Sequence, residues 1–112
     1  MENKQENIIV KNEREIIAIR FDSLIAVTID NYLCTFHIDG GDRFKCTKTL
    51  GDVKKLLPDY FIKIRRNTII NAQKIKSLRS KEREIVLYDE NTFKYAIQNG
   101  KIIKQYMKFG IS

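Results

Sequence analysis

Short, β-branched apolar runs separated by polar breaks dominate the first half of the chain, a pattern typical of antiparallel strands. Residues 32–38 (YLCTFHI) alternate in the strand manner, and the Asp39-Gly40-Gly41-Asp42 segment after them is a strong hairpin signal. The strands expected in this half cover residues 8–10, 15–20, 23–29, 32–38 and 43–47. The pattern therefore predicts a succession of short strands joined by turns.

Two later segments follow the helical period instead. The first begins after Thr49, which can cap a helix, and ends before Pro58. Its apolar face consists of Leu50, Val53, Leu56 and Leu57. The second covers residues 101–109 (KIIKQYMKF), where the shared apolar face consists of Ile102, Ile103, Tyr106 and Met107. Further strands are expected at residues 61–65, 74–79, 84–88 and 92–97.

These elements define the fold class. About nine short strands and two helices, without βαβ alternation, predict a mainly β fold of small antiparallel sheets with two or three short helices. A length of 112 residues suits one domain. We expect residues 1–7, which are polar, to form a flexible tail or linker stub, and residues 8–112 to form the domain.

The residue inventory argues against several classes of function. No apolar run approaches the roughly 20 residues of a membrane span, and the polar start does not resemble a secretory signal. Two cysteines, Cys34 and Cys46, are too few for a disulfide scaffold, so we expect reduced thiols in a cytoplasmic protein. Cys34 and the single histidine, His37, are three apart in a strand and point to opposite faces. We therefore expect no enzyme, metal, cofactor or small-molecule substrate.

The positive charge is concentrated in the second half of the chain. Residues 1–60 hold nine Lys/Arg against ten Asp/Glu, whereas residues 61–112 hold twelve against four. Such an excess favours a polyanionic partner such as DNA, RNA or an anionic membrane surface. Charge alone does not choose among them, and lysine-rich surfaces also keep small proteins soluble.

One segment, residues 59–71 (DYFIKIRRNTIIN), suggests how such a partner would be held. Phe61 and Ile64 can enter the core before the polar tetrad Arg65-Arg66-Asn67-Thr68, and Ile69-Ile70 re-enters it afterwards. Arg can form a bidentate hydrogen bond with guanine, while Asn and Thr can hydrogen-bond to phosphates or bases. Asn71 can close the following turn through its side chain. The alternative is an ordinary charged β-turn.

Residues 61–71 (FIKIRRNTIIN) resemble the characteristic stretch of the LytTR-type DNA-binding domain of bacterial transcription regulators: an aromatic residue, a basic segment ending Arg-Ser, two apolar residues and Asn. Upstream, residues 24–29, 30–32 and 49–57 match its strand, polar break and Leu-rich helix. Downstream, residues 74–112 match its last strands and basic helix. The resemblance covers roughly residues 8–108 and implies binding to double-stranded DNA through loops.

Carried over by position, the resemblance implies which residues would contact DNA. The base-contacting residues would be Asn31, Arg66 and Gln98. The phosphate-contacting residues would be Lys63, Arg65, Asn67 and Lys101. This chain departs from the family at Asn67, where the family usually has Ser, and at Gln98-Asn99, where many members carry Ser-Arg. Both changes affect hydrogen-bonding groups, so we expect a shifted sequence preference.

The resemblance also implies a biological role. We expect a bacterial transcription regulator, either stand-alone or the output domain of a two-component response regulator. Paired direct-repeat promoter sites and a homodimer on DNA would follow from the family. The main alternative is a protein-interaction module that modulates a related regulator. A third reading, a single-stranded RNA binder, would need exposed aromatics, for which the candidates are Tyr32, Phe36, Phe44, Phe93 and Tyr95.

Overall fold

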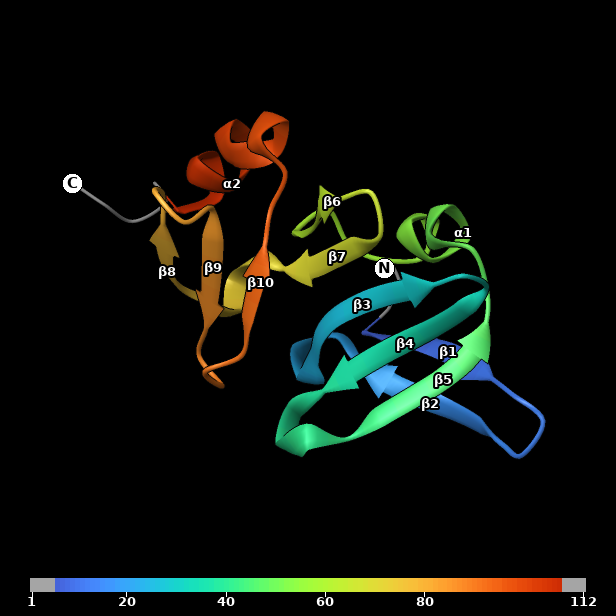
Figure 1. Ribbon diagram of the computed structural model, residues 1–112. Helices are drawn as coiled ribbons and strands as arrows, with labels where there is room; N and C mark the ends of the chain where they lie inside the picture. The colour runs from blue at the N-terminus through green and yellow to red at the C-terminus, as the bar shows by residue number, and fades with distance from the viewer. Residues whose placement is uncertain (1–5, 108–112) are drawn as a thin grey trace, which may run out of the picture.

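The computed structural model describes residues 6–107 and contains ten strands, two α-helices and several short 3₁₀ turns (Figure 1). The strands are β1 (Asn7–Lys11), β2 (Ile16–Arg20), β3 (Leu24–Asp30), β4 (Leu33–Ile38), β5 (Arg43–Thr47), β6 (Phe61–Arg65), β7 (Thr68–Asn71), β8 (Ile75–Arg79), β9 (Glu84–Leu87) and β10 (Thr92–Lys94). The helices are α1 (Leu50–Lys55) and α2 (Gly100–Met107). This confirms the mainly β fold class.

The strands form three antiparallel sheets. The central sheet has the order β5-β4-β3-β7-β6, the three-stranded sheet has the order β10-β9-β8, and β1 pairs with β2 in a hairpin. In Figure 1 the three-stranded sheet and α2 lie on one side of the central sheet, and the β1–β2 hairpin lies on the other. No helix within the described residues has the length and apolar character needed to cross a membrane.

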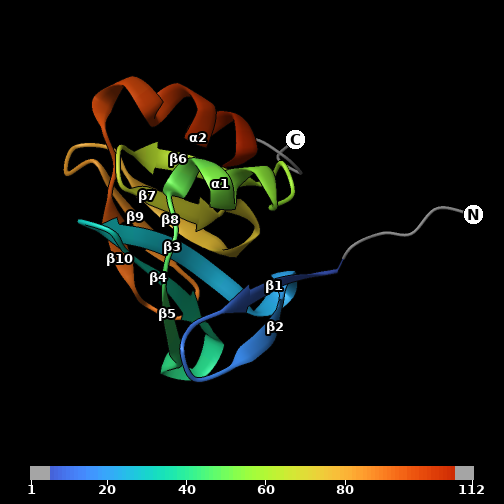
Figure 2. The same ribbon diagram turned by 90° about the vertical axis from the view of Figure 1, so that its right-hand side faces the viewer.

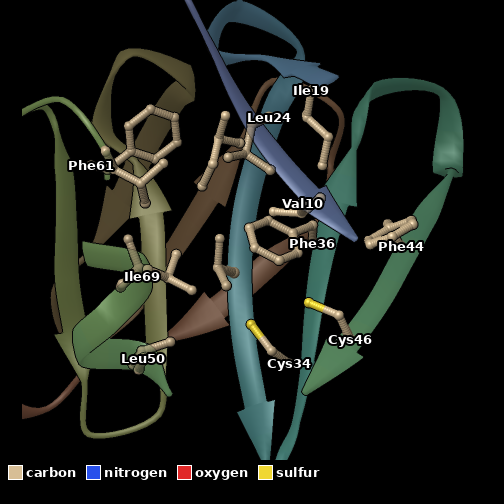
Figure 3. Packing of buried hydrophobic residues seen from close by; sticks show 14 of the residues in the cluster. Val10, Ile19, Leu24, Cys34, Phe36, Phe44, Cys46, Leu50, Phe61 and Ile69 are labelled. Atoms are coloured by element: carbon tan, nitrogen blue, oxygen red, sulfur yellow. The ribbon is translucent and has the colours of Figure 1, made fainter. Parts of the chain in front are cut away.

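The inner strands β3 and β7 of the central sheet are buried on both faces because their consecutive apolar residues point to different hydrophobic clusters. Val27 and Ile69 face a cluster that the β1–β2 hairpin and α1 complete (Figure 3). Their neighbours Ala26 and Ile70 face a second cluster shared with the three-stranded sheet and α2. Burial on two faces explains why these strands are continuous apolar runs rather than strict alternations.

β7 is the strand that the sequence pattern did not predict. The sequence predicts that Ile69 and Ile70 return to the core, that Thr68 belongs to the polar surface tetrad and that Asn71 closes a turn, with no strand of their own. The structure places β7 between β3 and β6, with all four residues buried. A run of four buried residues shows neither the polar–apolar alternation of a strand nor the period of a helix, so the hydrophobic pattern did not predict this strand.

Element ends also differ from expectation. The strand expected at residues 92–97 ends at Lys94, because the Ala96 amide leaves the sheet to donate to the Ile64 carbonyl at 2.8 Å. The first strand begins at Asn7, inside the expected tail; residues 1–5 and 108–112 lie outside the described part. The expected apolar faces are broken at Leu56 and Ile102, which are 41% and 43% exposed.

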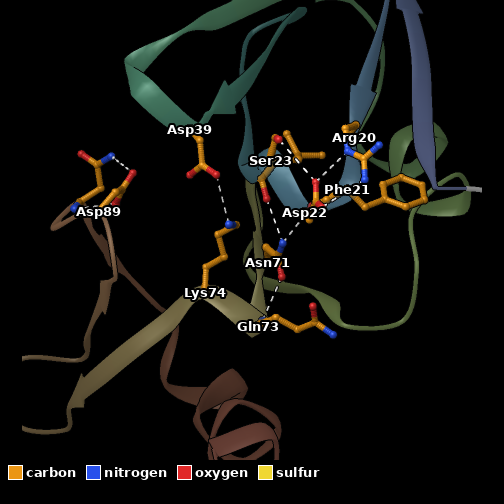
Figure 4. A network of polar contacts seen from close by, with 11 residues as sticks. Arg20, Phe21, Asp22, Ser23, Asp39, Asn71, Gln73, Lys74 and Asp89 are labelled. Carbon is orange, nitrogen blue, oxygen red and sulfur yellow. Dashed lines mark hydrogen bonds and ion pairs between the residues drawn. The ribbon is translucent and has the colours of Figure 1, made fainter.

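Asn71 ties the central sheet to the turn before β3. Its side chain is 1% exposed and donates two hydrogen bonds from Nδ2, to the Phe21 carbonyl at 3.2 Å and the Leu24 carbonyl at 2.9 Å (Figure 4). Its Oδ1 accepts from the Gln73 amide at 2.9 Å, which closes the turn after β7. The buried amide therefore satisfies backbone groups at the start of β3 and in the turn after β7.

We predict that Asn71→Ala lowers the free energy of unfolding by about 2–4 kcal/mol, because it removes two buried hydrogen bonds to the Phe21 and Leu24 carbonyls and the one accepted from the Gln73 amide. Asn71→Asp should be at least as damaging, since it keeps the acceptor but turns a carboxylate oxygen toward those carbonyls. Urea denaturation measures both, with the exposed Asn91→Ala as control. A loss below about 0.5 kcal/mol, the range of ordinary surface changes, would contradict the structural role of Asn71.

Candidate nucleic-acid interface

Three loops that are far apart in sequence converge on one side of the molecule. They are the β3–β4 turn, the β6–β7 turn and the loop from β10 into α2. Figure 2 shows the ends of β3 and β6 and the beginning of α2 on the same, left-hand side. Direct bonds link the loops: the Ile29 amide donates to the Asn67 carbonyl at 3.1 Å, and the Asn99 side chain donates to the Ile64 carbonyl at 2.9 Å.

The β3–β4 turn presents Asn31. Asp30 pairs with Leu33, so Asn31 and Tyr32 form the two-residue connection between the strands. Asn31 has φ 59°, a left-handed conformation that asparagine tolerates better than most residues. Both turn residues are exposed, which leaves the Asn31 amide free of packing contacts.

The β6–β7 turn presents Arg66 and Asn67. Arg65 pairs with Thr68, which leaves these two residues, both exposed, as the turn. The buried residues Ile64 and Thr68 anchor it from both sides. Thr68 Oγ1 donates to Asn67 Oδ1 at 3.1 Å, so the Asn67 amide nitrogen remains available to donate outward. Three residues of the expected polar tetrad are therefore exposed, whereas the fourth, Thr68, is buried and does not reach the surface as the sequence predicted.

The third loop presents Gln98. Gln98 is the middle residue of the 3₁₀ turn Ile97–Asn99, which leads directly into α2. Asn99 is tied inward to the Ile64 carbonyl, whereas Gln98 and Lys101 are exposed. The expected base-contacting residues thus stand on three adjoining loops.

The cations of this side carry no carboxylate partner. The ion pairs of residues 6–107 engage other cations: Arg20, Lys74, Lys76 and Arg79. Lys63 and Arg65 are exposed on β6, which is an edge strand of the central sheet, and Arg66 follows directly. Uncompensated positive charge of this kind attracts an anion.

Two further cations, Arg83 and Lys94, adjoin this side and were not singled out from the sequence. The sequence pattern leaves Arg83 between two predicted strands and places Lys94 within the strand expected at residues 92–97, with no functional role for either. Together with Arg65 they line one cleft. Their approach depends on the pairing of β9 with β10, in which Glu84 faces Lys94, and the sequence pattern does not encode that pairing.

The two thiols and the histidine lie on β4 and β5 of the central sheet. Cys34 and Cys46 are directly opposite each other on β4 and β5, both buried and free (Figure 3). Burial raises the pKa of Cys34 to about 12. His37 lies on the other face of β4, where Nε2 and Thr28 Oγ1 are 2.9 Å apart and burial lowers its pKa. Within residues 6–107 no cluster of metal-ligating side chains occurs.

The aromatic residues give little support to single-stranded RNA binding. Phe36, Phe44 and Tyr95 are buried, and Phe93 is half-buried beside His37, with ring centroids 6.1 Å apart. Among the five candidates only Tyr32 is largely exposed, at 83%. A stacking platform needs several exposed rings on one strand face.

Comparison with known proteins agrees with the fold. A family model described as the LytTr DNA-binding domain matches residues 14–108. Among solved structures, the LytTr DNA-binding domain of a protein assigned as a methyl-accepting/DNA response regulator from Bacillus cereus superposes with a TM-score of 0.78. The alignment covers 95% of this chain and 100% of that chain at 14% identity, a level that shows a shared fold. Comparison with curated proteins finds no match.

We predict that the folded protein resists thiol-modifying reagents at pH 8, because a pKa of about 12 leaves almost no Cys34 thiolate. Unfolding in urea should expose both thiols, restore ordinary pKa values near 8.5 and accelerate the reaction. Because folding raises these pKa values, the protein should also lose stability as the pH rises above about 9. A colorimetric disulfide reagent measures the rates; fast labelling of folded protein would contradict the buried pair.

Proposed function

Because this chain belongs to the LytTr DNA-binding domain family, we propose that it binds double-stranded DNA sequence-specifically through the three adjoining loops. The observation that carries the proposal is the convergence of exposed Asn31, Arg66 and Gln98 on adjoining loops, two of which are hydrogen-bonded to the neighbouring strands β3 and β6. Side chains with both donors and acceptors, or with forked donors, are the ones that read base edges in the major groove.

Each base-contacting residue would read what its chemistry permits. The Arg66 guanidinium can donate two parallel hydrogen bonds to guanine O6 and N7. The Asn31 and Gln98 amides can each pair with adenine N6 and N7. Loops fixed by backbone bonds and buried anchors would present these groups with little loss of freedom on binding, which favours both affinity and discrimination.

Lys63, Arg65, Asn67 and Lys101 would hold the DNA backbone. The three cations lack ion-pair partners within residues 6–107, so phosphate binding would not require breaking a salt bridge. Asn67 has its Nδ2 group to donate, because Thr68 engages its Oδ1. These contacts would supply salt-dependent affinity without selecting sequence.

The biological role that follows is a cytoplasmic bacterial transcription regulator, stand-alone or as the output domain of a two-component response regulator. Two copies would occupy directly repeated promoter sites and pair on the DNA. No cofactor, catalytic step or small-molecule substrate is part of the proposal. The alternative, a protein-interaction module for a related regulator, would use the same surface without DNA.

Selection of bound sequences from a random duplex pool at moderate salt tests the proposal. A reproducible consensus is expected, with binding that weakens steeply as salt rises. Absence of enrichment would contradict sequence-specific binding. Binding to a regulator that persists at high salt would favour the interaction module, whose apolar contacts salt does not screen.

We predict that Arg66→Ala weakens binding to the selected site by about 1–3 kcal/mol and relaxes preference at one base pair, because a bidentate contact is lost. The fold should be unchanged, since Arg66 is exposed in a turn. Fluorescence anisotropy with the selected and singly substituted duplexes measures both effects. The control is Arg43→Ala, which removes an exposed arginine at the other end of the central sheet. An Arg66→Ala variant with unchanged base preference would show that Arg66 does not read the DNA sequence.

A different signature is expected for Lys63→Ala. Loss of one phosphate contact should weaken selected and unselected duplexes alike and lower the slope of log K against log salt by about 0.9. Titrations at four or more salt concentrations measure that slope. A change confined to the selected duplex would show that Lys63 reads sequence instead.

A further inference from the structure

A basic cleft lies beside the three loops, between the β8–β9 turn and the segment leading into α2. It is open to solvent, and its volume of about 580 Å³ leaves ample room for a phosphodiester group. Side chains of Arg65, Arg83 and Lys94 line it, together with Glu82 and the segment from Tyr95 to Ile97. The cleft ends one residue before Gln98, which we propose reads a base.

Strand pairing fixes the walls of the cleft. β10 pairs with β9 so that Lys94 lies opposite Glu84, immediately after Arg83. The Tyr95 amide donates to the Arg83 carbonyl at 3.0 Å, and the Ala96 amide donates to the Ile64 carbonyl at 2.8 Å. Three elements therefore meet here, and each contributes one cation.

The charges of the cleft are largely uncompensated. None of its three cations belongs to an ion pair within residues 6–107. Lys94 Nζ donates to the Glu82 backbone carbonyl at 3.1 Å, which holds the ammonium at the cleft and leaves its other protons to donate. Glu82 is the single carboxylate of the lining, so the cleft carries a net positive charge.

We propose that this cleft seats a backbone phosphate of the bound DNA, on the flank of the bases read by Gln98, with Arg83 and Lys94 as its ligands. The proposal rests on the proposed function, because the cleft extends the same interface. A forked guanidinium and an ammonium that line the same cleft suit a phosphate oxygen pair. The seat would fix the register of the duplex on the loops without reading sequence.

The double variant Arg83→Gln/Lys94→Gln tests the seat. Glutamine removes each charge and retains a polar side chain, and at Arg83, which has φ 51°, it adds no new backbone constraint. With the selected duplex, binding should weaken at least about tenfold, and the slope of log K against log salt should fall by roughly 1.8, the value for two phosphate contacts. The selected consensus should remain the same.

The matched control is Arg43→Gln/Lys45→Gln. It removes the same amount of charge from two exposed positions on β5, the edge strand of the central sheet opposite β6, and neither residue belongs to an ion pair within residues 6–107. Its binding should stay within about twofold of the original protein, since charges more than a Debye length of roughly 10 Å away are largely screened. Glu82→Gln should act in the opposite direction and strengthen binding.

Hydroxyl-radical footprinting adds a positional readout. The original protein should protect backbone outside the consensus on one flank, and the cleft variant should lose that protection alone. Equal binding and equal footprints for the cleft variant and its charge-matched control would contradict the proposed phosphate site in the cleft. Failure of the original protein to bind any duplex would instead overturn the proposed function, and the seat with it, so the two failures are distinguishable.

Discussion

The pairing of β7 between β3 and β6 is the constraint on which the rest of the structure depends. Each residue of this short strand is buried, so β7 contributes to both hydrophobic clusters while completing two ladders. Asn71 at its end bonds the carbonyls of Phe21 and Leu24, where the chain enters β3. The strand therefore sets the position of β3 relative to β6.

That position brings the candidate interface together. Because β3 and β7 are antiparallel, the end of β3 and the beginning of β7 meet, which places Asn31 near the Arg66-Asn67 turn. β6 then offers its Ile64 carbonyl to Ala96 and Asn99, which anchors the loop that holds Gln98. The loops are thus displayed by a sheet whose inner strands β3 and β7 are buried on both faces, a rigid support that suits binding residues.

The sequence pattern predicted much of this fold and less of the site. Nine of the strands, both helices and the Thr49 cap follow from apolar periodicity and turn residues, because local preferences agree with the global fold. The Arg65–Thr68 tetrad could also be recognised locally. Asn31 and Gln98 came from family resemblance, and Arg83 and Lys94 were missed, since only long-range pairing brings those residues together.

We propose that the three adjoining loops form one DNA-reading surface. Backbone amide NMR of the chain titrated with its selected duplex tests it most directly. The account predicts shift changes and slowed hydrogen exchange concentrated at Asn31, Arg66-Asn67 and Gln98, with the β4–β5 turn unchanged. Changes concentrated on that distant turn, or on one loop alone, would contradict the account.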